Sequence, residues 1–329
     1  MLAISELVRV ALTVDDEGSS PLALSVAEPW SGERVLFVRS STNHVFLLSG
    51  GAGETVLRFR PADAGALERS REVADLAARL AAAGAPVAAA LPSCDGRLAV
   101  ELQVGESVYV ASVYARASGR QIESESATPA EARAWGRGLA LFHDAARQLE
   151  PPPRRPQWID VVRDAAETVR ERGARDAGGA IVETLEHFVS DGNGFGVAHG
   201  DPELDNVIWQ GAAPVFVDLD DAAWSWLAAD ISFALRDFSR IAGAPDAASP
   251  HVAAFLAGYG EVRSFDEDEL SSLSMFGRAH ALVLLARLER TLDEAADPDW
   301  PEWATALRGR IERIAAGFAS AIVAPGEVS

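Results

Sequence analysis

The chain has 329 residues, 48% of them hydrophobic, and a formal net charge of -20 at pH 7. This length is enough for two lobes with a sizeable core. The acidic balance argues against nucleic acid as a partner, because phosphate backbones require a basic surface. It is compatible with a cationic substrate, and the alternative explanation is simple solubility. No run of about 18 apolar residues is present, so no transmembrane helix and no membrane partner are expected.

Cysteine usage and the N-terminal sequence bear on the cellular compartment. The single cysteine, Cys94, permits no internal disulfide and no cysteine metal cluster. The first residues lack a basic start and turn acidic at 15–17, which is unlike a signal peptide. Together these features predict a cytoplasmic protein. All 29 basic residues are arginine.

The N-terminal part is predicted to form a small antiparallel sheet with one main helix. Apolar alternation bounded by turn residues predicts strands over 34–38, 44–48, 55–60, 98–102 and 107–114. A helix is predicted over 65–83, where apolar residues recur at helical spacing and Gly84 ends the run. Weaker patterns predict a helix over 4–13 and a strand over 22–26.

Beyond residue 114 the pattern becomes helical. Thr128, Pro129 and Glu131 stand at the N-cap, N1 and N3 positions of a helix that runs to Gln148. Apolar periodicity predicts further helices over 158–172, 179–190, 230–241, 247–259, 266–296 and 300–321. The sequence therefore predicts two domains, a small lobe over 1–114 and a helical lobe over 115–329.

The stretch 197–221, VAHGDPELDNVIWQGAAPVFVDLDD, carries the most chemical information. His199, Gly200 and Asp201 follow an apolar run, and Asn206 comes five positions after Asp201. Short apolar strands over 207–209 and 215–217, joined by turn residues, predict a hairpin. Because the two ends of a hairpin lie together, Asn206 and Asp218 are expected side by side, close to Asp201.

Two carboxylates and an amide oxygen would form a site of hard oxygen donors, which suits magnesium rather than zinc. Asp201 is not needed as a metal ligand and is available to accept a proton from a hydroxyl. A base together with metal ligands that neutralise phosphate charge is what phosphoryl transfer requires. Each piece alone is also typical of an ordinary turn, so the prediction depends on the combination.

The segment HGDPELDN, followed by FVDLDDA, resembles the catalytic loop and metal-binding segment of the aminoglycoside phosphotransferase and choline kinase superfamily. The FVDLDDA ending is most similar to the bacterial stress-response Ser/Thr kinase branch and its homoserine-kinase-like relatives. The resemblance implies an α+β, bilobal protein-kinase-like fold that uses ATP and Mg²⁺. It also implies that Asp201 is the catalytic base, that Asn206 and Asp218 hold the metal, and that His199 positions the loop. Asp230 would support the loop structurally.

The same resemblance implies nucleotide contacts in the small lobe. The turn between the first two strands matches the loop that covers the phosphates, with Ser41, Thr42 and Asn43 as its contacts. The glycine-rich turn at 50–53 falls one hairpin later and is interpreted as a plain hairpin turn. Val113, Tyr114 and Ala115 fall at the hinge whose backbone would read the adenine.

A basic residue on the third strand is expected to bind phosphate. Arg58 stands where the superfamily usually carries a lysine, and it keeps the charge with a different geometry. Arg60 lies on the same strand face, so alternation does not separate the two. Glu72 is the expected carboxylate partner of this cation, with Glu68 as a competitor one turn earlier; a solvated surface charge is the alternative for each.

The phosphate acceptor is left open by the sequence. An aminoglycoside or other amino alcohol, a homoserine-like metabolite, and a Ser/Thr hydroxyl of a peptide or protein are all compatible with the motif. An acidic cluster beside the site suits a cationic acceptor or serves the structure alone: Glu203, Asp205, Asp220 and Asp221. A pseudokinase that binds nucleotide or a partner protein without turnover is the alternative, favoured by Arg58 and opposed by the intact catalytic motif. Nothing in the sequence fixes the oligomeric state.

Overall fold

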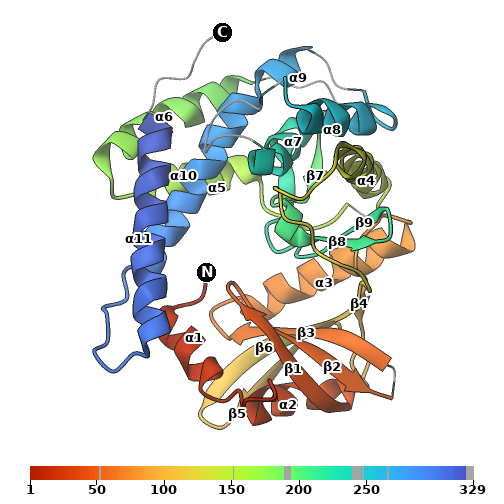
Figure 1. The fold of residues 1–329 in the computed structure, drawn as a ribbon, viewed down its shortest axis with the longest axis vertical. Helices are drawn as coiled ribbons and strands as arrows, with labels where there is room; N and C mark the ends of the chain where they lie inside the picture. The colour runs from red at the N-terminus through yellow and green to blue at the C-terminus, as the bar shows by residue number, and fades with distance from the viewer. Residues whose placement is uncertain are drawn as a thin grey trace. The chain divides into compact units, whose positions relative to one another are not determined.

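The structure is a computed structural model and describes residues 1–51, 53–150, 152–188, 194–238, 246, 248–264 and 267–323. The chain forms two compact units (Figure 1). The first contains Met1–Ala82, Ala88–Arg116 and Thr291–Arg310, and the second Ala83–Val87, Ala117–Arg290 and Ile311–Ser329. The predicted division after residue 114 did not anticipate that Thr291–Arg310 joins the N-terminal unit.

The first unit is built on a six-stranded antiparallel sheet with strand order β1-β2-β3-β6-β4, in which β5 also pairs with β6. Its strands are β1 (Gly32–Ser40), β2 (His44–Gly50), β3 (Gly53–Pro61), β4 (Ala90–Leu91), β5 (Val100–Val104) and β6 (Ser107–Ala115). All five predicted strands are present. The two-residue strand β4 was not predicted, because it is too short to show alternation.

Strand alternation divides this sheet into two faces. Leu57 and Phe59 of β3 are buried in a cluster that includes residues of α1 (Ile4–Ala11) and α2 (Pro21–Ala27). Arg58 lies between them in sequence, so its side chain projects from the other face. The helix α3 (Ala66–Ala82) packs against β4 and β6, as predicted for 65–83. Figure 1 shows α1 and α2 near the sheet at the start of the chain.

The predicted strand over 22–26 is wrong, because this segment is the helix α2. Ser20 caps it by accepting a hydrogen bond from the amide of Ala23 at 3.1 Å, and Pro21 occupies the first turn. The buried residues Ala23, Val26 and Ala27 follow the i, i+3, i+4 spacing of a helix. In so short a segment the same apolar letters also fit a strand pattern, which is why periodicity alone gave the wrong element.

The second unit is mainly helical. Its helices include α4 (Pro129–Arg147), α5 (Trp158–Thr168), α6 (Arg172–His187), α7 (Leu227–Leu235), α8 (Pro250–Gly260), α9 (Glu267–Ser271) and α10 (Leu273–Thr291); α11 (Glu302–Val323) runs through both units of the chain. The capping box that was predicted for α4 is present. Thr128 Oγ1 accepts from the amide of Glu131 at 3.2 Å, and Glu131 Oε2 accepts from the amide of Thr128 at 2.8 Å.

Several helix boundaries differ from the prediction. The helix predicted over 158–172 ends at Thr168, and Arg175 stabilises the break by donating to the carbonyl of Val169 from Nε at 2.9 Å and Nη2 at 2.6 Å. The helix predicted over 266–296 is two helices, α9 and α10, of which α10 ends at Thr291. The helices predicted over 179–190 and 230–241 begin and end earlier, at Arg172–His187 (α6) and Leu227–Leu235 (α7). Residues 190 and 241 themselves lie outside the described residues. Among the described helices, none has both the length and the apolar character needed to cross a lipid bilayer.

Candidate active site

Two short antiparallel strand pairs frame the predicted catalytic stretch. Strand β7 (Phe195–Ala198) pairs with β10 (Ala223–Trp226), and β8 (Val207–Gln210) pairs with β9 (Ala213–Phe216). The β8–β9 hairpin confirms the prediction. The β7–β10 pair was not predicted, because its two strands are distant in sequence and no turn motif joins them. Ala198 faces Ala223, so the loops that begin at His199 and end at Ala222 leave the same end of this pair.

The backbone of the His-Gly-Asp segment is fixed by the buried carboxylate of Asp230. The amide of His199 donates to Asp230 Oδ2 at 2.6 Å, and the amide of Gly200 donates to Oδ1 at 2.8 Å. His199 Nε2 lies 3.1 Å from the carbonyl of Val217, and the amide of Asp201 donates to His199 Nδ1 at 3.3 Å. This pattern requires the proton on Nε2, and burial lowers the pKa of His199, which favours the neutral ring. His199 therefore links the loop over 199–206, the first loop, to the loop over 217–222, the second loop.

Asp230 is in turn held by a buried chain of side chains from α4 and α8. His143 Nε2 lies 2.9 Å from Asp230 Oδ2, and His143 Nδ1 lies 2.9 Å from the hydroxyl of Tyr259. Burial lowers the pKa of His143 and raises that of Tyr259. A neutral His143 donates to Asp230 through Nε2 and accepts from Tyr259 through Nδ1. The resemblance implied a structural Asp230, but nothing in the sequence indicated its contact with His143.

Asn206 connects Asp201 to the hairpin. Its Nδ2 donates to Asp201 Oδ2 at 3.1 Å and to the Asp201 carbonyl at 3.0 Å, while its own carbonyl accepts from the amide of Val217 at 2.9 Å. Asn206 is buried, with 5% of its surface exposed. The amide nitrogen of Asn206 donates both of these side-chain bonds, and its amide oxygen takes part in neither. The two ends of the hairpin therefore meet beside Asp201, as the spacing predicted.

Asp201 has an altered acidity. Burial raises its pKa to about 7, and the negative charges of Asp221 and Asp218 act in the same direction, while Arg236 and Arg287 act against it. A carboxylate with a pKa near neutrality accepts a proton far more readily than an ordinary aspartate does. The environment of Asp201 is therefore suited to general-base chemistry.

The two loops touch through their backbones. Gly200 has φ of 86°, and a Cβ atom at this position would lie 2.1 Å from the carbonyl oxygen of Asp221. Only glycine fits such an approach. Asp218, two residues after β9, has φ of 68°, a left-handed conformation that aspartate adopts at a cost. This local strain directs the chain back toward the first loop.

Arginines pair with two of the four acids predicted to contact the acceptor. Arg287 of α10 forms a two-pronged pair with Asp221, with both N–O distances at 2.7 Å. Arg236 forms an ion pair with Glu203. The sequence did not suggest either arginine, because Arg287 lies 66 positions from Asp221 and no spacing links them.

The other two predicted acceptor contacts differ in their surroundings. Asp205 is exposed, and its carbonyl accepts from Gln121 Nε2 at 2.8 Å. The carbonyl of Asp220 accepts from Arg155 Nη2 at 2.9 Å, and Arg155 Nε also donates to the carbonyl of Ala222 at 2.6 Å. Arg155 therefore fixes the backbone of the second loop from the side of α5.

The donors available for a metal are few, and they are oxygens. Across the described part of the chain, no group of three His, Cys, Asp or Glu side chains has the arrangement of a protein-enclosed metal site. Asn206 and Asp218 stand at adjacent ends of the hairpin, linked by the bond from Val217 to the Asn206 carbonyl. One amide and one carboxylate oxygen fit a magnesium ion that takes few protein ligands and keeps water and phosphate oxygens. They do not fit structural zinc.

In the first unit, the two candidate phosphate-binding arginines are now distinguishable. Arg60 lies near the end of β3 and forms an ion pair with Asp63 at 3.4 Å. Arg58 lies two residues earlier in the strand, with its guanidinium 5.5 Å from the centre of the Tyr114 ring. Tyr114 is one of the predicted hinge residues, so Arg58 rather than Arg60 lies beside the predicted adenine segment.

The two candidate glutamates of α3 differ in exposure. The side chain of Glu68 is 61% exposed, and it lies 4.0 Å from Arg71 on the helix surface. Glu72 is only partly exposed and precedes the buried Val73. Glu68 is therefore a solvated surface charge, which was the alternative for both glutamates. Glu72 stays the candidate partner of Arg58.

The predicted adenine segment lies at the end of β6. Val113 and Tyr114 pair with both β3 and β4, and the amide of Ala115 donates to the carbonyl of Ala89 at 2.8 Å. That amide is therefore not available to a base. The prediction that Ala115 contributes its backbone to adenine recognition has to be restricted to its carbonyl.

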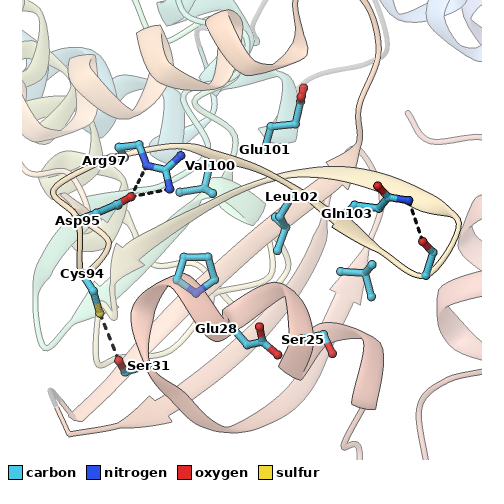
Figure 2. A pocket seen from close by; sticks show the side chains of 13 residues that line it. Ser25, Glu28, Ser31, Cys94, Asp95, Arg97, Val100, Glu101, Leu102 and Gln103 are labelled. Atoms are coloured by element: carbon cyan, nitrogen blue, oxygen red, sulfur yellow. Dashed lines mark hydrogen bonds and ion pairs between the residues drawn. The ribbon is translucent and has the colours of Figure 1, made fainter.

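A separate groove of about 770 Å³ lies in the first unit, between the segment after α2, the turn before β5, and β5 itself. Figure 2 shows Cys94 hydrogen-bonded to Ser31 and Arg97 paired with Asp95 along its wall. None of the predicted site residues lines it. The groove is therefore not assigned to the reaction, and Cys94 on its wall is exposed.

Comparisons with known proteins bear on the family. The profile of the APH phosphotransferase enzyme family matches residues 35–271. No curated protein matches the sequence.

Three solved structures illustrate the structural similarity. An amicoumacin kinase in complex with AMP-PNP, Ca²⁺ and Ami has a TM-score of 0.73 at 16% identity, over 94% of this chain and 95% of that chain. A microcompartment-associated aminopropanol kinase has a TM-score of 0.69 at 20% identity, over 91% and 94%. An ethanolamine kinase of Plasmodium vivax has a TM-score of 0.58 at 12% identity, over 90% and 83%.

At such identities the structural likeness establishes the fold, and it confirms the predicted bilobal protein-kinase-like architecture. The profile match spans most of the chain and includes the whole segment from His199 to Asp221. The superfamily predicted from HGDPELDN and FVDLDDA is thereby confirmed, while the particular branch stays a prediction. The chain belongs to the APH phosphotransferase enzyme family.

Proposed function

We propose that this phosphotransferase uses ATP and Mg²⁺ to transfer the γ-phosphoryl group to the hydroxyl of a small molecule. The observation that carries the proposal is the state of Asp201. Its carboxylate is held by Asn206 Nδ2 at 3.1 Å, and its pKa is raised to about 7. A base of this strength beside two oxygen ligands is what phosphoryl transfer to an alcohol needs.

The residues would act as follows. Asp201 accepts the proton of the acceptor hydroxyl as the acceptor oxygen bonds to the γ-phosphorus, and the bond from that phosphorus to the β–γ bridging oxygen breaks. Asn206 and Asp218 would hold Mg²⁺, which when bound neutralises charge on the phosphates. His199 acts indirectly, because its bond to Val217 keeps the two loops in register.

Nucleotide binding would involve residues of the first unit. We assign the phosphate contacts to Arg58, with Glu72 as its partner, and to the loop of Ser41, Thr42 and Asn43. Val113, Tyr114 and the carbonyl of Ala115 would contact the adenine. The amicoumacin kinase that shares the fold is described with AMP-PNP, which supports a nucleoside triphosphate as the phosphoryl donor.

The acceptor is proposed from the charges beside Asp201. Because Glu203 and Asp221 already form ion pairs with arginines, a polycation would find fewer free carboxylates than the sequence suggested. This supports an acceptor with a single amino group, such as a small amino alcohol, over an aminoglycoside; the exposed Asp205 is its candidate contact. The structural relatives named as aminopropanol kinase and ethanolamine kinase act on compounds of this class by name. A Ser/Thr side chain of a peptide is the second acceptor to test.

A pseudokinase is the alternative function, and the specific observation in its favour is Arg58. A guanidinium is bulkier than the ammonium it replaces and binds phosphate with another geometry. Such a protein would bind nucleotide without turnover.

A phosphoryl-transfer assay with radiolabelled ATP separates these possibilities. The panel should contain amino alcohols, hydroxy amino acids, aminoglycosides and Ser/Thr peptides, with Asp201→Asn protein as the matched control. Labelled product that appears with the wild type and is lost in the variant supports the proposed function. Nucleotide binding without product across the panel supports the pseudokinase.

A further inference from the structure

We propose that Glu6 and His44 are positioning residues for the phosphate-covering loop over 41–43, and that the N-terminal helix α1 holds this loop in its binding conformation. The inference rests on the nucleotide role proposed above for that loop. It assigns a function to a chain of polar side chains, the buried Glu6 and His44 and the half-buried Ser40, which neither the sequence motif nor the proposed reaction uses.

The first link of this chain closes the loop itself. Ser40 ends β1, His44 begins β2, and the two residues face each other in the strand register. Ser40 Oγ lies 2.8 Å from His44 Nδ1. Within the loop the amide of Ser41 donates to the carbonyl of Asn43 at 3.1 Å. The loop is therefore tied at its base by two side chains as well as by the backbone.

The second link carries this tie to α1. His44 is completely buried, and its ring lies 5.1 Å from that of Phe59 in the sheet core. Its Nε2 lies 3.1 Å from Glu6 Oε1, and Glu6 is 8% exposed. A buried carboxylate and a buried imidazole that satisfy each other fix both positions, because breaking the pair leaves an unsatisfied polar group.

The other oxygen of Glu6 is also occupied. Arg9, one turn later on α1, donates to Glu6 Oε2 from Nε at 2.8 Å and from Nη2. Arg9 Nη1 donates to Ser107 Oγ at 2.8 Å, and its guanidinium lies 5.3 Å from the centre of the Tyr109 ring. These contacts join α1 to β6, so the carboxylate that meets His44 has a rigid support.

Two backbone contacts strengthen the link. The amide of Leu2 donates directly to the loop carbonyl of Ser41 at 2.8 Å. At the start of α1, where no side chain of the helix provides a cap, the amide of Ser5 donates to the carboxylate of Glu294 at 3.1 and 3.3 Å. Arg308 Nη1 holds that segment by donating to the Glu294 carbonyl at 2.6 Å. An acidic group at a helix N-terminus is also favoured by the helix dipole.

The sheet separates this chain of contacts from the predicted phosphate contact. His44 packs on Phe59, on the core face, whereas Arg58 projects from the opposite face. Glu6 and His44 would therefore act on the nucleotide only through the loop backbone. An ordered loop loses less conformational entropy when it binds phosphate, so the expected effect is on ATP affinity rather than on the chemical step.

The test measures AMP-PNP binding with Mg²⁺ by calorimetry, together with KM for ATP and kcat. Glu6→Ala and His44→Asn each break one link and should weaken AMP-PNP binding about five- to tenfold, with kcat at saturating ATP within about twofold of wild type. Glu6→Gln keeps a single oxygen for its two partners, His44 and Arg9, so it should weaken binding less than Glu6→Ala does. Ser40→Ala removes only a half-buried hydroxyl. It tests the link between Ser40 and His44 if the other variants do not fold. Amide exchange over 41–44 should quicken in every variant that weakens binding.

Ser20→Ala is the matched control, because it removes a buried hydroxyl from the cap of α2 in the same unit without touching the loop. Wild-type affinity in Glu6→Ala, His44→Asn and Ser40→Ala overturns this inference and leaves the proposed function intact. Equal weakening in Ser20→Ala overturns it as well, because the effect would then reflect general destabilisation. A wild-type protein that binds no nucleotide would instead overturn the proposed function, and the inference with it.

Discussion

His143 Nε2 lies 2.9 Å from Asp230 Oδ2, and neither side chain is exposed to solvent. The same carboxylate accepts from the amides of His199 and Gly200. One buried aspartate thus joins α4 to the backbone of the loop that carries Asp201. The geometry of the candidate base depends on groups that never contact a substrate.

Asp230→Asn should therefore affect both stability and turnover. Asparagine offers one acceptor oxygen where three donors converge, so at least one buried donor loses its partner. We expect a loss of about 2–4 kcal/mol in the free energy of unfolding, measured by urea denaturation, with a parallel loss of phosphoryl transfer. The control is Asp144→Asn, at a half-exposed carboxylate on the same helix as His143 that pairs with Arg263 at 3.6 Å. It should change both quantities far less. Unaltered stability in Asp230→Asn would show that the three bonds are not needed.

Asp201→Asn should lower phosphoryl transfer by about 10²–10⁴-fold, the usual contribution of a general base. The amide oxygen can still accept from Asn206 Nδ2, so the loop should keep its shape. ATP affinity, measured by calorimetry, should be nearly unchanged, because a base acts in the transition state. Near wild-type turnover in the variant would remove Asp201 from the chemistry.

Asp218→Ala should abolish the dependence of nucleotide binding on magnesium. The carboxylate is the only charged ligand in the proposed pair with Asn206, and its loss leaves the amide oxygen alone. The measurement is ATP titration by calorimetry with and without Mg²⁺. If the magnesium-linked gain in affinity survives, Asp218 has a structural role, which its positive φ would then explain.

Arg58→Ala should weaken ATP binding by about 1.5–3 kcal/mol, the range for hydrogen bonds to charged groups. Arg58→Lys is more informative. If the pocket still accepts the ammonium usual in the superfamily, activity should survive or rise. If the pocket has adapted to the guanidinium, which lies over the Tyr114 ring, activity should fall. Unchanged affinity and turnover in Arg58→Ala would move the phosphate contact to Arg60 or to the loop over 41–43.

His280 should make stability depend on pH. It is buried against the ring of Phe233, with ring centres 3.9 Å apart, and burial together with Arg236 and Arg287 lowers its pKa well below the usual value. The unfolded chain takes up a proton below about pH 6.5, whereas the native state does not. The free energy of unfolding should therefore fall as pH decreases through that value, by up to about 1.4 kcal/mol per pH unit.

His280→Phe removes this contribution. In urea denaturation without metal or nucleotide, the stability of the variant relative to wild type should rise between pH 7.5 and 5.5. Other titrating groups, such as His143, His199 and Asp201, are present in both proteins and cancel in the difference. A constant difference across this range would mean that His280 is not held neutral.

The part of the site formed by local sequence could be predicted. Asn206 and Asp218 meet because one hairpin joins them, and apolar alternation with turn residues determines that hairpin. Asp201 lies five positions before Asn206, so it could not be far from either. The same local signals predicted the strands of the first unit and the capping box of α4.

Contacts between distant segments could not be predicted. Glu6 meets His44 across 38 positions, and His143 meets Asp230 across 87; such pairs are selected by packing and leave no periodic signal. Arg58 and Arg60 share a strand face, and only the neighbours Asp63 and Tyr114 distinguish them. The strand prediction over 22–26 was wrong for a different, local reason. Five residues are too few for the helix and strand periods to be distinguished.

The two-pronged ion pair between Arg287 and Asp221 has a consequence for when the catalytic segment can form during translation. Asp218, Asp220 and Asp221 leave the ribosome many residues before Arg287 does, since 66 positions separate Arg287 from Asp221. Until α10 has been translated, this acidic segment lacks the guanidinium that neutralises it and holds it beside the first loop. The nascent chain therefore cannot complete the contacts of its catalytic segment until Arg287 has been translated.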